Sequence, residues 1–141
     1  MQLVCPACLT RNRVPDARLG DEPLCGQCGA KLLPAHPIDV DDASLERHVA
    51  GNEMPLLVDC WAAWCGPCRS MAPQFEAASR QLPGVRFAKL DTEAAQRSAA
   101  AYGIRSIPTL LLFRGGKEIA RRSGALPAQE IVSWVRSQVA A

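Results

Sequence analysis

Apolar residues recur along the chain from Ile38 onward in two alternating patterns. Dense apolar runs are typical of strands buried in a sheet, whereas apolar residues three and four positions apart indicate helices. The pattern predicts strands over residues 38–40, 56–61, 85–90, 109–114 and 117–122, and helices over residues 43–50, 65–81, 93–102 and 127–139. Asp41 or Asp42 and Thr92 are the expected N-caps of the first and third helices, and Gly115-Gly116 predicts a hairpin. The order βαβαβαββα is typical of a mixed sheet with helices on both faces.

The first 33 residues follow neither pattern. They contain several prolines and glycines and too little apolar sequence to build a core of their own. Pro34 and Pro37 then indicate a short stiff linker, because each proline fixes its own backbone and disfavours helix in the residue before it. We expect a small domain at residues 1–33, a linker at residues 34–37 and an αβ domain at residues 38–141. Such a linker suggests that the first domain is separable from the second.

Length and composition fit one ordinary core with a small appendage, since 48% of the 141 residues are hydrophobic. The 16 basic and 14 acidic side chains nearly balance, which argues against a nucleic-acid or anionic-membrane partner. The sequence shows no secretory signal and no run of ~20 apolar residues, so we expect a cytoplasmic protein. In that reducing compartment, seven cysteines indicate metal ligands, catalytic thiols and buried thiols rather than a disulfide framework.

Four cysteines of the first domain form two C-x-x-C pairs separated by sixteen residues: Cys5, Cys8, Cys25 and Cys28. This spacing is typical of a four-thiolate zinc site, because each short loop can place two sulfurs on one tetrahedral ion. Four reduced thiols without a metal and an iron-sulfur cluster are the alternatives. We favour one structural zinc ion, because the segment has little else to fold around.

A third C-x-x-C pair, Cys65-Gly66-Pro67-Cys68, stands where a buried strand ends and a helix begins. Cys65 would lie at the positive end of the helix dipole, which favours its thiolate. Cys68 comes round to the same face one turn later, close enough to form a disulfide with Cys65. The geometry predicts that Cys65 attacks a substrate disulfide and that Cys68 resolves the mixed disulfide. A further metal knuckle is the alternative, but no other pair of cysteines completes it.

The αβ domain resembles the thioredoxin family. The residues that carry the resemblance are Trp61-Ala62-Ala63-Trp64-Cys65-Gly66-Pro67-Cys68, Pro73, Lys89, Ile107-Pro108-Thr109 and Gly124. With the four-cysteine segment in front, the whole chain resembles the zinc-containing bacterial members of that family. The resemblance implies a thioredoxin fold, with a five-stranded mixed sheet, preceded by a small zinc-ribbon-like domain.

The resemblance also implies roles for single residues. Asp59 matches a buried aspartate that takes the proton from the buried cysteine, and Lys89 matches its lysine partner. A buried carboxylate is costly, so its pKa should rise and Asp59 could act as a base near neutral pH; a purely structural Asp59–Lys89 pair is the alternative. Pro108 matches the family's cis-proline, although the sequence does not reveal the isomer. The implied substrate-binding surface comprises Trp64, Gly66, Pro67, Ile107, Pro108 and Gly124.

The expected function is reduction of protein disulfides, with recycling by an NADPH-dependent thioredoxin reductase. The expected partners are that reductase and disulfide-containing proteins; the chain is expected to be a monomer without an organic cofactor. Cys60 should face away from Cys68 as an inert buried thiol, because side chains alternate along a strand. A zinc-dependent binding or stress-sensing module is the alternative from another functional class. An oxidase or isomerase is less favoured, because no histidine stands between Cys65 and Cys68.

Overall fold

Five strands form a mixed sheet in the computed structural model, which describes residues 1–140. In the order of the sheet they are β3 (Ile38–Val40), β5 (Arg86–Asp91), β4 (Leu56–Trp61), β6 (Thr109–Arg114) and β7 (Lys117–Ser123). β3, β5 and β4 are parallel, whereas β6 is antiparallel to β4 and to β7. The helices are α1 (Asp42–Gly51), α2 (Gly66–Gln81), α3 (Gln96–Ala101) and α4 (Ala128–Val139). Within residues 1–140, each helix is too short or too polar to span a membrane.

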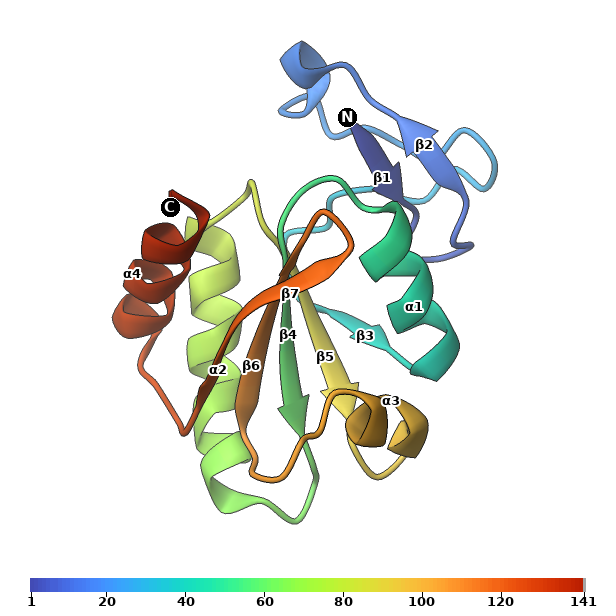
Figure 1. Ribbon diagram of the computed structural model, residues 1–141. Helices are drawn as coiled ribbons and strands as arrows, with labels where there is room; N and C mark the ends of the chain where they lie inside the picture. Colours follow the sequence, from blue (N-terminus) through green and yellow to red (C-terminus); the bar gives the residue numbers. More distant parts are fainter. Residues whose placement is uncertain (141) are drawn as a thin grey trace.

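A pair of helices covers each face of the sheet (Figure 1). α2 and α4 lie on one face, over an apolar cluster that includes Leu57, Phe75 and Ile131. α1 and α3 lie on the other face, over a cluster that includes Leu45 and Val58. Successive residues of β4 enter the two clusters in turn, so this central strand is buried on both faces. The predicted mixed sheet with helices on both faces is confirmed.

Local signals account for the ends of several elements. Asp41 is the N-cap of α1: its carboxylate accepts the backbone N–H of Ser44 at 2.8 Å, and the Ser44 hydroxyl accepts that of Asp41 at 2.8 Å. Between β6 and β7, Gly115 and Gly116 have φ angles of 62° and 79°. Two successive left-handed residues suit a tight hairpin turn, which explains the glycine pair.

The third helix is shorter than predicted. The pattern predicts residues 93–102 with Thr92 as the cap, but α3 begins at Gln96 and has no side-chain cap. The Asp91 carboxylate accepts the backbone N–H groups of Glu93 and Ala94, at 2.9 and 3.4 Å, and so holds these residues in a turn. Thr92 instead donates its hydroxyl to the carbonyl of Trp61, at 3.1 Å. The predicted cap was wrong because a competing aspartate lies one residue earlier.

The N-terminal segment, residues 1–33, has more regular structure than its sequence pattern predicts. β1 (Gln2–Val4) and β2 (Arg11–Arg13) form an antiparallel pair, followed by the single 3₁₀ turn Asp16–Arg18. A small apolar cluster lies beside it: Leu3, Cys5, Val14, Cys25, Leu32 and Met54. Met54 belongs to the αβ domain, so this cluster is shared between the two parts of the chain.

Buried polar groups of the αβ domain bind the N-terminal segment. Arg86 is 4% exposed, and its Nη2 donates to the carbonyls of Val4 and Leu32, at 3.3 and 2.8 Å. The Asn52 side chain accepts the N–H of Val4 at 3.2 Å. His48 of α1 is also buried, and its burial together with the charge of Arg86 lowers the pKa of His48 to about 4. The αβ domain thus binds both the N–H and the carbonyl of Val4, so the segment is held more firmly than a linker between separable domains suggests.

Gly51, the last residue of α1, lies where the two parts of the chain pack closely against each other. A Cβ atom at this position would lie 2.8 Å from Cγ2 of Val4 and 2.9 Å from Nε of Arg11. Both distances are below van der Waals contact, so a larger residue would push the N-terminal segment away. Glycine here serves close packing rather than an unusual backbone angle.

We predict that Gly51→Ala destabilises the full chain by about 1–3 kcal/mol, because the added methyl group clashes with Val4. Gly84→Ala is the matched control, since a Cβ atom there would meet nothing within 4 Å. Denaturant unfolding of both variants gives the two free energies. Equal values would mean that the interface can shift at no cost.

The same substitution in a chain that begins at Ala35 should be neutral or slightly stabilising, because alanine is favoured over glycine in a helix. This comparison assigns the cost to the N-terminal segment rather than to α1. A penalty that persists in the shortened chain would contradict that assignment.

Candidate active site and metal centre

Cys65 and Cys68 lie at the start of α2, directly after the turn that follows β4. Their side chains form a disulfide, with the Cα atoms 5.2 Å apart. Cys65 is the N-cap of α2, and its Sγ accepts the backbone N–H of Cys68 at 3.2 Å. Unpaired N–H groups at a helix N-terminus stabilise a thiolate, so the reduced form favours negative charge on Cys65. In this oxidised form both residues are nearly covered, at 4% and 2% exposure.

Asp59 lies fully buried on β4, six residues before Cys65. Within residues 1–140, neither of its carboxyl oxygens has a hydrogen-bond partner. Burial raises the pKa of Asp59 to about 7, and the charge of Lys89 opposes this rise only in part. Lys89 is the register partner of Asp59 on β5, but its Nζ lies over the Trp61 ring, 4.9 Å from the centroid. Asp59 is therefore poised to exchange a proton near neutral pH.

The loop before β6 brings Ile107 and Pro108 to the redox pair. The Ile107–Pro108 peptide bond is cis. The carbonyl oxygen of Ile107 lies 3.7 Å from Sγ of Cys65. Gly124, with a φ angle of 100°, donates its N–H to the Pro108 carbonyl at 2.9 Å. Residues far apart in the sequence thus form one surface around Cys65.

Trp64 projects from this surface and is 69% exposed, so it does not fill the core. Its indole Nε1 donates to the carboxylate of Glu93 at 2.7 Å. The apolar pattern does not indicate Glu93 as a site residue, because it places this residue in a helix. Its presence in the turn that Asp91 forms brings its side chain to Trp64.

Cys60 belongs to the cluster under α1 and α3, on the face of the sheet opposite α2. It is fully buried, and burial raises its pKa to about 12. A thiol that does not ionise near neutral pH is a poor nucleophile. Cys60 thus has the surroundings of an inert structural thiol.

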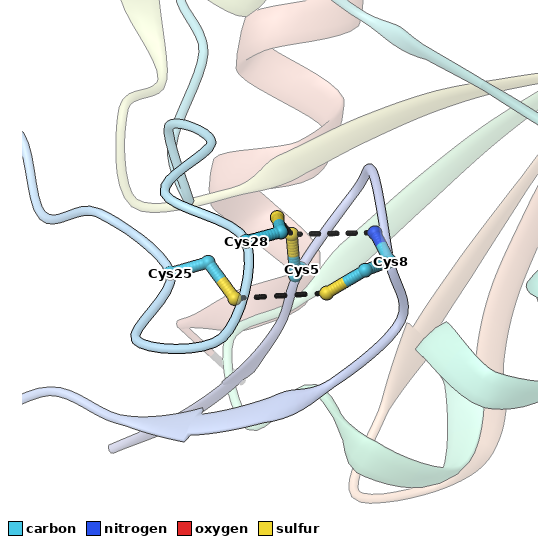
Figure 2. Close-up of side chains that lie close together, drawn as sticks. All are labelled: Cys5, Cys8, Cys25 and Cys28. Atoms are coloured by element: carbon cyan, nitrogen blue, oxygen red, sulfur yellow. Dashed lines mark hydrogen bonds between the residues drawn. The ribbon is translucent and has the colours of Figure 1, made fainter.

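Four cysteine sulfurs of the N-terminal segment converge, as Figure 2 shows. The Sγ atoms of Cys5, Cys8, Cys25 and Cys28 all lie within 4.8 Å of one another. The Cys5–Cys28 and Cys8–Cys25 sulfur pairs are 3.6 and 3.7 Å apart. A tetrahedron with zinc–sulfur bonds of about 2.3 Å has sulfur–sulfur edges of about 3.8 Å. The four side chains therefore fit a tetrahedral ion.

The surroundings of these sulfurs favour negative charge on some of them. The backbone N–H of Cys28 and the Asn12 amide donate hydrogen bonds to Cys25 and lower its pKa to about 6. The Ala30 N–H lowers the pKa of Cys28, but the Cys8 side chain, loss of water and the Cys5 side chain together outweigh it, and the pKa rises to about 12. Four thiolates this close repel one another, so only a bound cation would keep all four charged.

Comparison with known proteins identifies the family of the chain. Residues 36–137 match the family model described as Thioredoxin. A curated relative, Thioredoxin C-3 of Corynebacterium nephridii, is 45% identical over 99% of this chain and 96% of its own length. The chain belongs to the thioredoxin family. A mutant thioredoxin from Halobacterium salinarum is similar in structure, with a TM-score of 0.68 and 30% identity over 74% of this chain and 92% of that chain.

The two parts of this thioredoxin match separate families. Residues 4–30 match the model described as Thioredoxin 2, N-terminal, which is a zinc-ribbon family. The thioredoxin of Synechocystis is 46% identical over 67% of this chain and 89% of its own length. With its C-x-x-C pair at Cys65 and Cys68, the chain is a thiol-disulfide oxidoreductase.

We predict that Asp59→Asn stabilises this thioredoxin, and that the gain grows with pH. The folded pKa of about 7 lies above the unfolded value, so the wild type loses stability as pH rises from about 4 to about 7. Asparagine does not titrate, so the gain should increase by about 3 kcal/mol between about pH 5 and about pH 8. Denaturant unfolding across this range measures it.

Asp39→Asn is the control for this prediction, because Asp39 is an exposed aspartate of β3. Its substitution also removes one carboxylate, and it should not reproduce the gain of Asp59→Asn. A gain for Asp59→Asn that stays constant with pH would show that Asp59 does not titrate in this range.

Proposed function

We propose that this thioredoxin is a protein-disulfide reductase, with Cys65 as the nucleophile and Cys68 as the resolving thiol. The observation that carries the proposal is the Cys65–Cys68 disulfide at the N-terminus of α2, beside the carbonyl of Ile107. The helix terminus stabilises a thiolate at Cys65, and the Ile107 loop offers main chain next to it. A nucleophile beside a peptide surface suits a disulfide held in a polypeptide.

In the first step, the Cys65 thiolate of the reduced protein attacks one sulfur of the substrate disulfide. A bond forms between Cys65 and that sulfur, and the second substrate sulfur leaves as a thiolate. The Cys68 N–H, 3.2 Å from the Cys65 sulfur, favours the attacking charge.

In the second step, Cys68 loses its proton and attacks Cys65, which releases the reduced substrate. Asp59 is the proposed base, because its raised pKa lets it accept a proton near neutral pH. Lys89, beside Asp59 in the sheet, lowers that pKa and limits how far it rises. The product is the Cys65–Cys68 disulfide, and the substrate has gained the two electrons.

The proposed substrate-binding surface surrounds Cys65. Its members are Trp64, Gly66, Pro67, Ile107, Pro108 and Gly124. The exposed indole of Trp64 and the half-buried side chain of Ile107 supply apolar contact area next to the redox pair. Such a surface accommodates many partners because it relies on main chain and apolar contacts rather than on charge.

We propose that Cys5, Cys8, Cys25 and Cys28 bind one structural Zn²⁺ ion. The fit of the four sulfurs to a tetrahedron supports this, as do the N–H groups of Ala7 and Gln27, 3.4 Å from Cys5 and Cys25 sulfurs. When bound, zinc would hold the N-terminal segment together and would take no part in thiol exchange.

The proposed partners are a thioredoxin reductase that draws electrons from NADPH and disulfide-containing proteins. The proposed setting is the cytoplasm, where a reductant is available to restore the two thiols. We propose a monomer, without a nucleic-acid or membrane partner and without a bound organic cofactor. The near balance of 16 basic and 14 acidic side chains agrees with this proposal.

Reduction of insulin, coupled to NADPH and a bacterial thioredoxin reductase, tests the function. The wild type should consume NADPH in proportion to the disulfides reduced. Cys65→Ser should abolish turnover, whereas Cys68→Ser should stop it after the first attack and accumulate a mixed disulfide at Cys65. Cys60→Ala is the matched control and should keep the activity. Absence of insulin reduction by the wild type would overturn the proposal.

A second prediction concerns the metal. The purified protein should contain one zinc ion per chain, and its removal should expose amides of residues 1–33 to hydrogen exchange. Because Val4 and Leu32 hold Arg86, protection should also fall around β5.

Hydrogen exchange with mass spectrometry, before and after chelation, measures both effects, and Cys5→Ser should reproduce the stripped state. Substoichiometric zinc, or unchanged protection after its removal, would contradict the structural role.

A further inference from the structure

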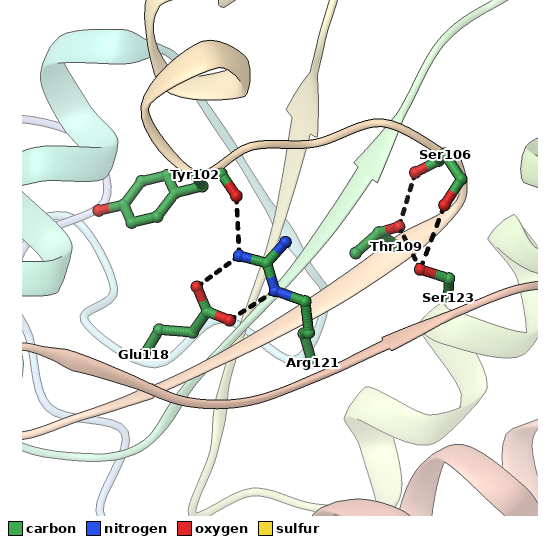
Figure 3. Close-up of polar contacts among 6 residues, drawn as sticks. All are labelled: Tyr102, Ser106, Thr109, Glu118, Arg121 and Ser123. Carbon is green, nitrogen blue, oxygen red and sulfur yellow. Dashed lines mark hydrogen bonds and ion pairs between the residues drawn. The ribbon is translucent and has the colours of Figure 1, made fainter.

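Three hydroxyl side chains form a closed set of hydrogen bonds beside the Ile107 loop, as Figure 3 shows. Thr109 Oγ1 lies 2.6 Å from the carbonyl oxygen of Ser106 and 2.9 Å from Oγ of Ser123. Oγ of Ser106 lies 3.3 Å from Oγ of Ser123. Ser106 begins the loop, Thr109 begins β6, and Ser123 ends β7. We call these three residues the hydroxyl ring.

The direction of every hydrogen bond in the ring follows from the single proton of each hydroxyl. A carbonyl can only accept, so Thr109 donates to the Ser106 carbonyl. Thr109 must then accept from Ser123, and Ser123, having used its proton, must accept from Ser106. The ring therefore starts at the side chain of Ser106 and returns to its main chain. Bonds oriented head to tail strengthen one another.

This ring holds the loop from both of its ends. Ser106 and Thr109 flank the Ile107–Pro108 dipeptide, and both are bound to Ser123. The next residue, Gly124, donates its N–H to the Pro108 carbonyl at 2.9 Å. The end of β7 thus contacts residues 106, 108 and 109 and fixes the peptide between them. That peptide carries the Ile107 carbonyl, 3.7 Å from the Cys65 sulfur.

We propose that Ser106, Thr109 and Ser123 are positioning residues that hold the Ile107 main chain in place for the backbone of a polypeptide substrate. This inference rests on the proposed reduction of protein disulfides. It adds a physical reason why protein disulfides would be reduced faster than small ones. A disulfide in a polypeptide brings main chain that can align with the fixed loop. A small disulfide lacks that main chain and needs only the Cys65 thiolate. Removal of the ring should therefore slow the reduction of protein disulfides selectively.

Ser123→Ala is the variant of choice, because Ser123 is exposed and its loss leaves the buried Thr109 bonded to the Ser106 carbonyl. Stopped-flow measurements on the reduced full chain give second-order rate constants for insulin and for 2-hydroxyethyl disulfide. The variant removes both hydrogen bonds of the Ser123 hydroxyl, so the rate constant for insulin should fall at least about five-fold, the equivalent of one ordinary hydrogen bond. The rate constant for 2-hydroxyethyl disulfide should not change.

Two further variants complete the design. Ser123→Thr keeps the hydroxyl and should restore the insulin rate constant. Ser137→Ala removes a hydroxyl that also bonds a carbonyl, that of Trp134 at 2.7 Å on α4, and should change neither rate constant.

Equal slowing of both disulfides by Ser123→Ala, no slowing with insulin, or failure of Ser123→Thr to restore the rate would overturn the positioning role. In those cases the wild type still reduces insulin, so the proposed function stands. A wild type that reduces only 2-hydroxyethyl disulfide would overturn the proposed function, and this inference with it.

Discussion

The burial of β4 on both faces of the sheet is the constraint on which the redox site depends. Helices cover this strand from both sides, so every side chain from Leu56 to Cys60 is enclosed. The chain emerges from the core at the carboxyl end of β4, where it turns and α2 begins. This exit brings Cys65 to the N-terminus of a helix, where backbone N–H groups stabilise its thiolate. The chemistry at Cys65 thus originates in the packing of the strand before it.

The same burial explains the divergent behaviour of neighbouring groups on β4. Asp59 points to the face of α2 and Cys60 to the opposite face, and both are fully enclosed. Loss of water raises the pKa of each, to about 7 for Asp59 and to about 12 for Cys60. The first value makes a carboxyl group useful as a base, whereas the second makes a thiol inert. One physical effect therefore raises the pKa of both groups, with opposite consequences for ionisation near neutral pH.

The N-terminal segment completes the core of the αβ domain as well as its own. Without this segment, the guanidinium of Arg86 would lose the carbonyls of Val4 and Leu32, and Met54 would lose its apolar neighbours. Val4 directly precedes Cys5 of the four-cysteine cluster, so order in that cluster and order at the interface are linked through one residue. Through this link, order among the four cysteines can affect the stability of the redox domain.

The sequence by itself determined the elements and the chemistry that neighbouring residues share. Strand and helix periods placed the helices and strands of the αβ domain, because alternation reports which side chains face a core, but they missed β1 and β2. Spacing indicated the chemistry of the C-x-x-C pairs, because two cysteines three residues apart can bind one metal ion or form a disulfide whatever the rest of the fold is. Within the αβ domain, a short-range rule failed where two local signals competed, at Asp91 and Thr92.

Tertiary structure alone decided which distant residues meet. No periodicity reveals that Arg86 binds Val4, that Gly51 must be small, or that the Ser106 hydroxyl donates a hydrogen bond to Ser123. The cis state of the Ile107–Pro108 bond and the contact of Glu93 with Trp64 belong to the same class. The physical reason is that a pattern specifies the face on which a side chain lies, whereas its partner is set by how the faces pack.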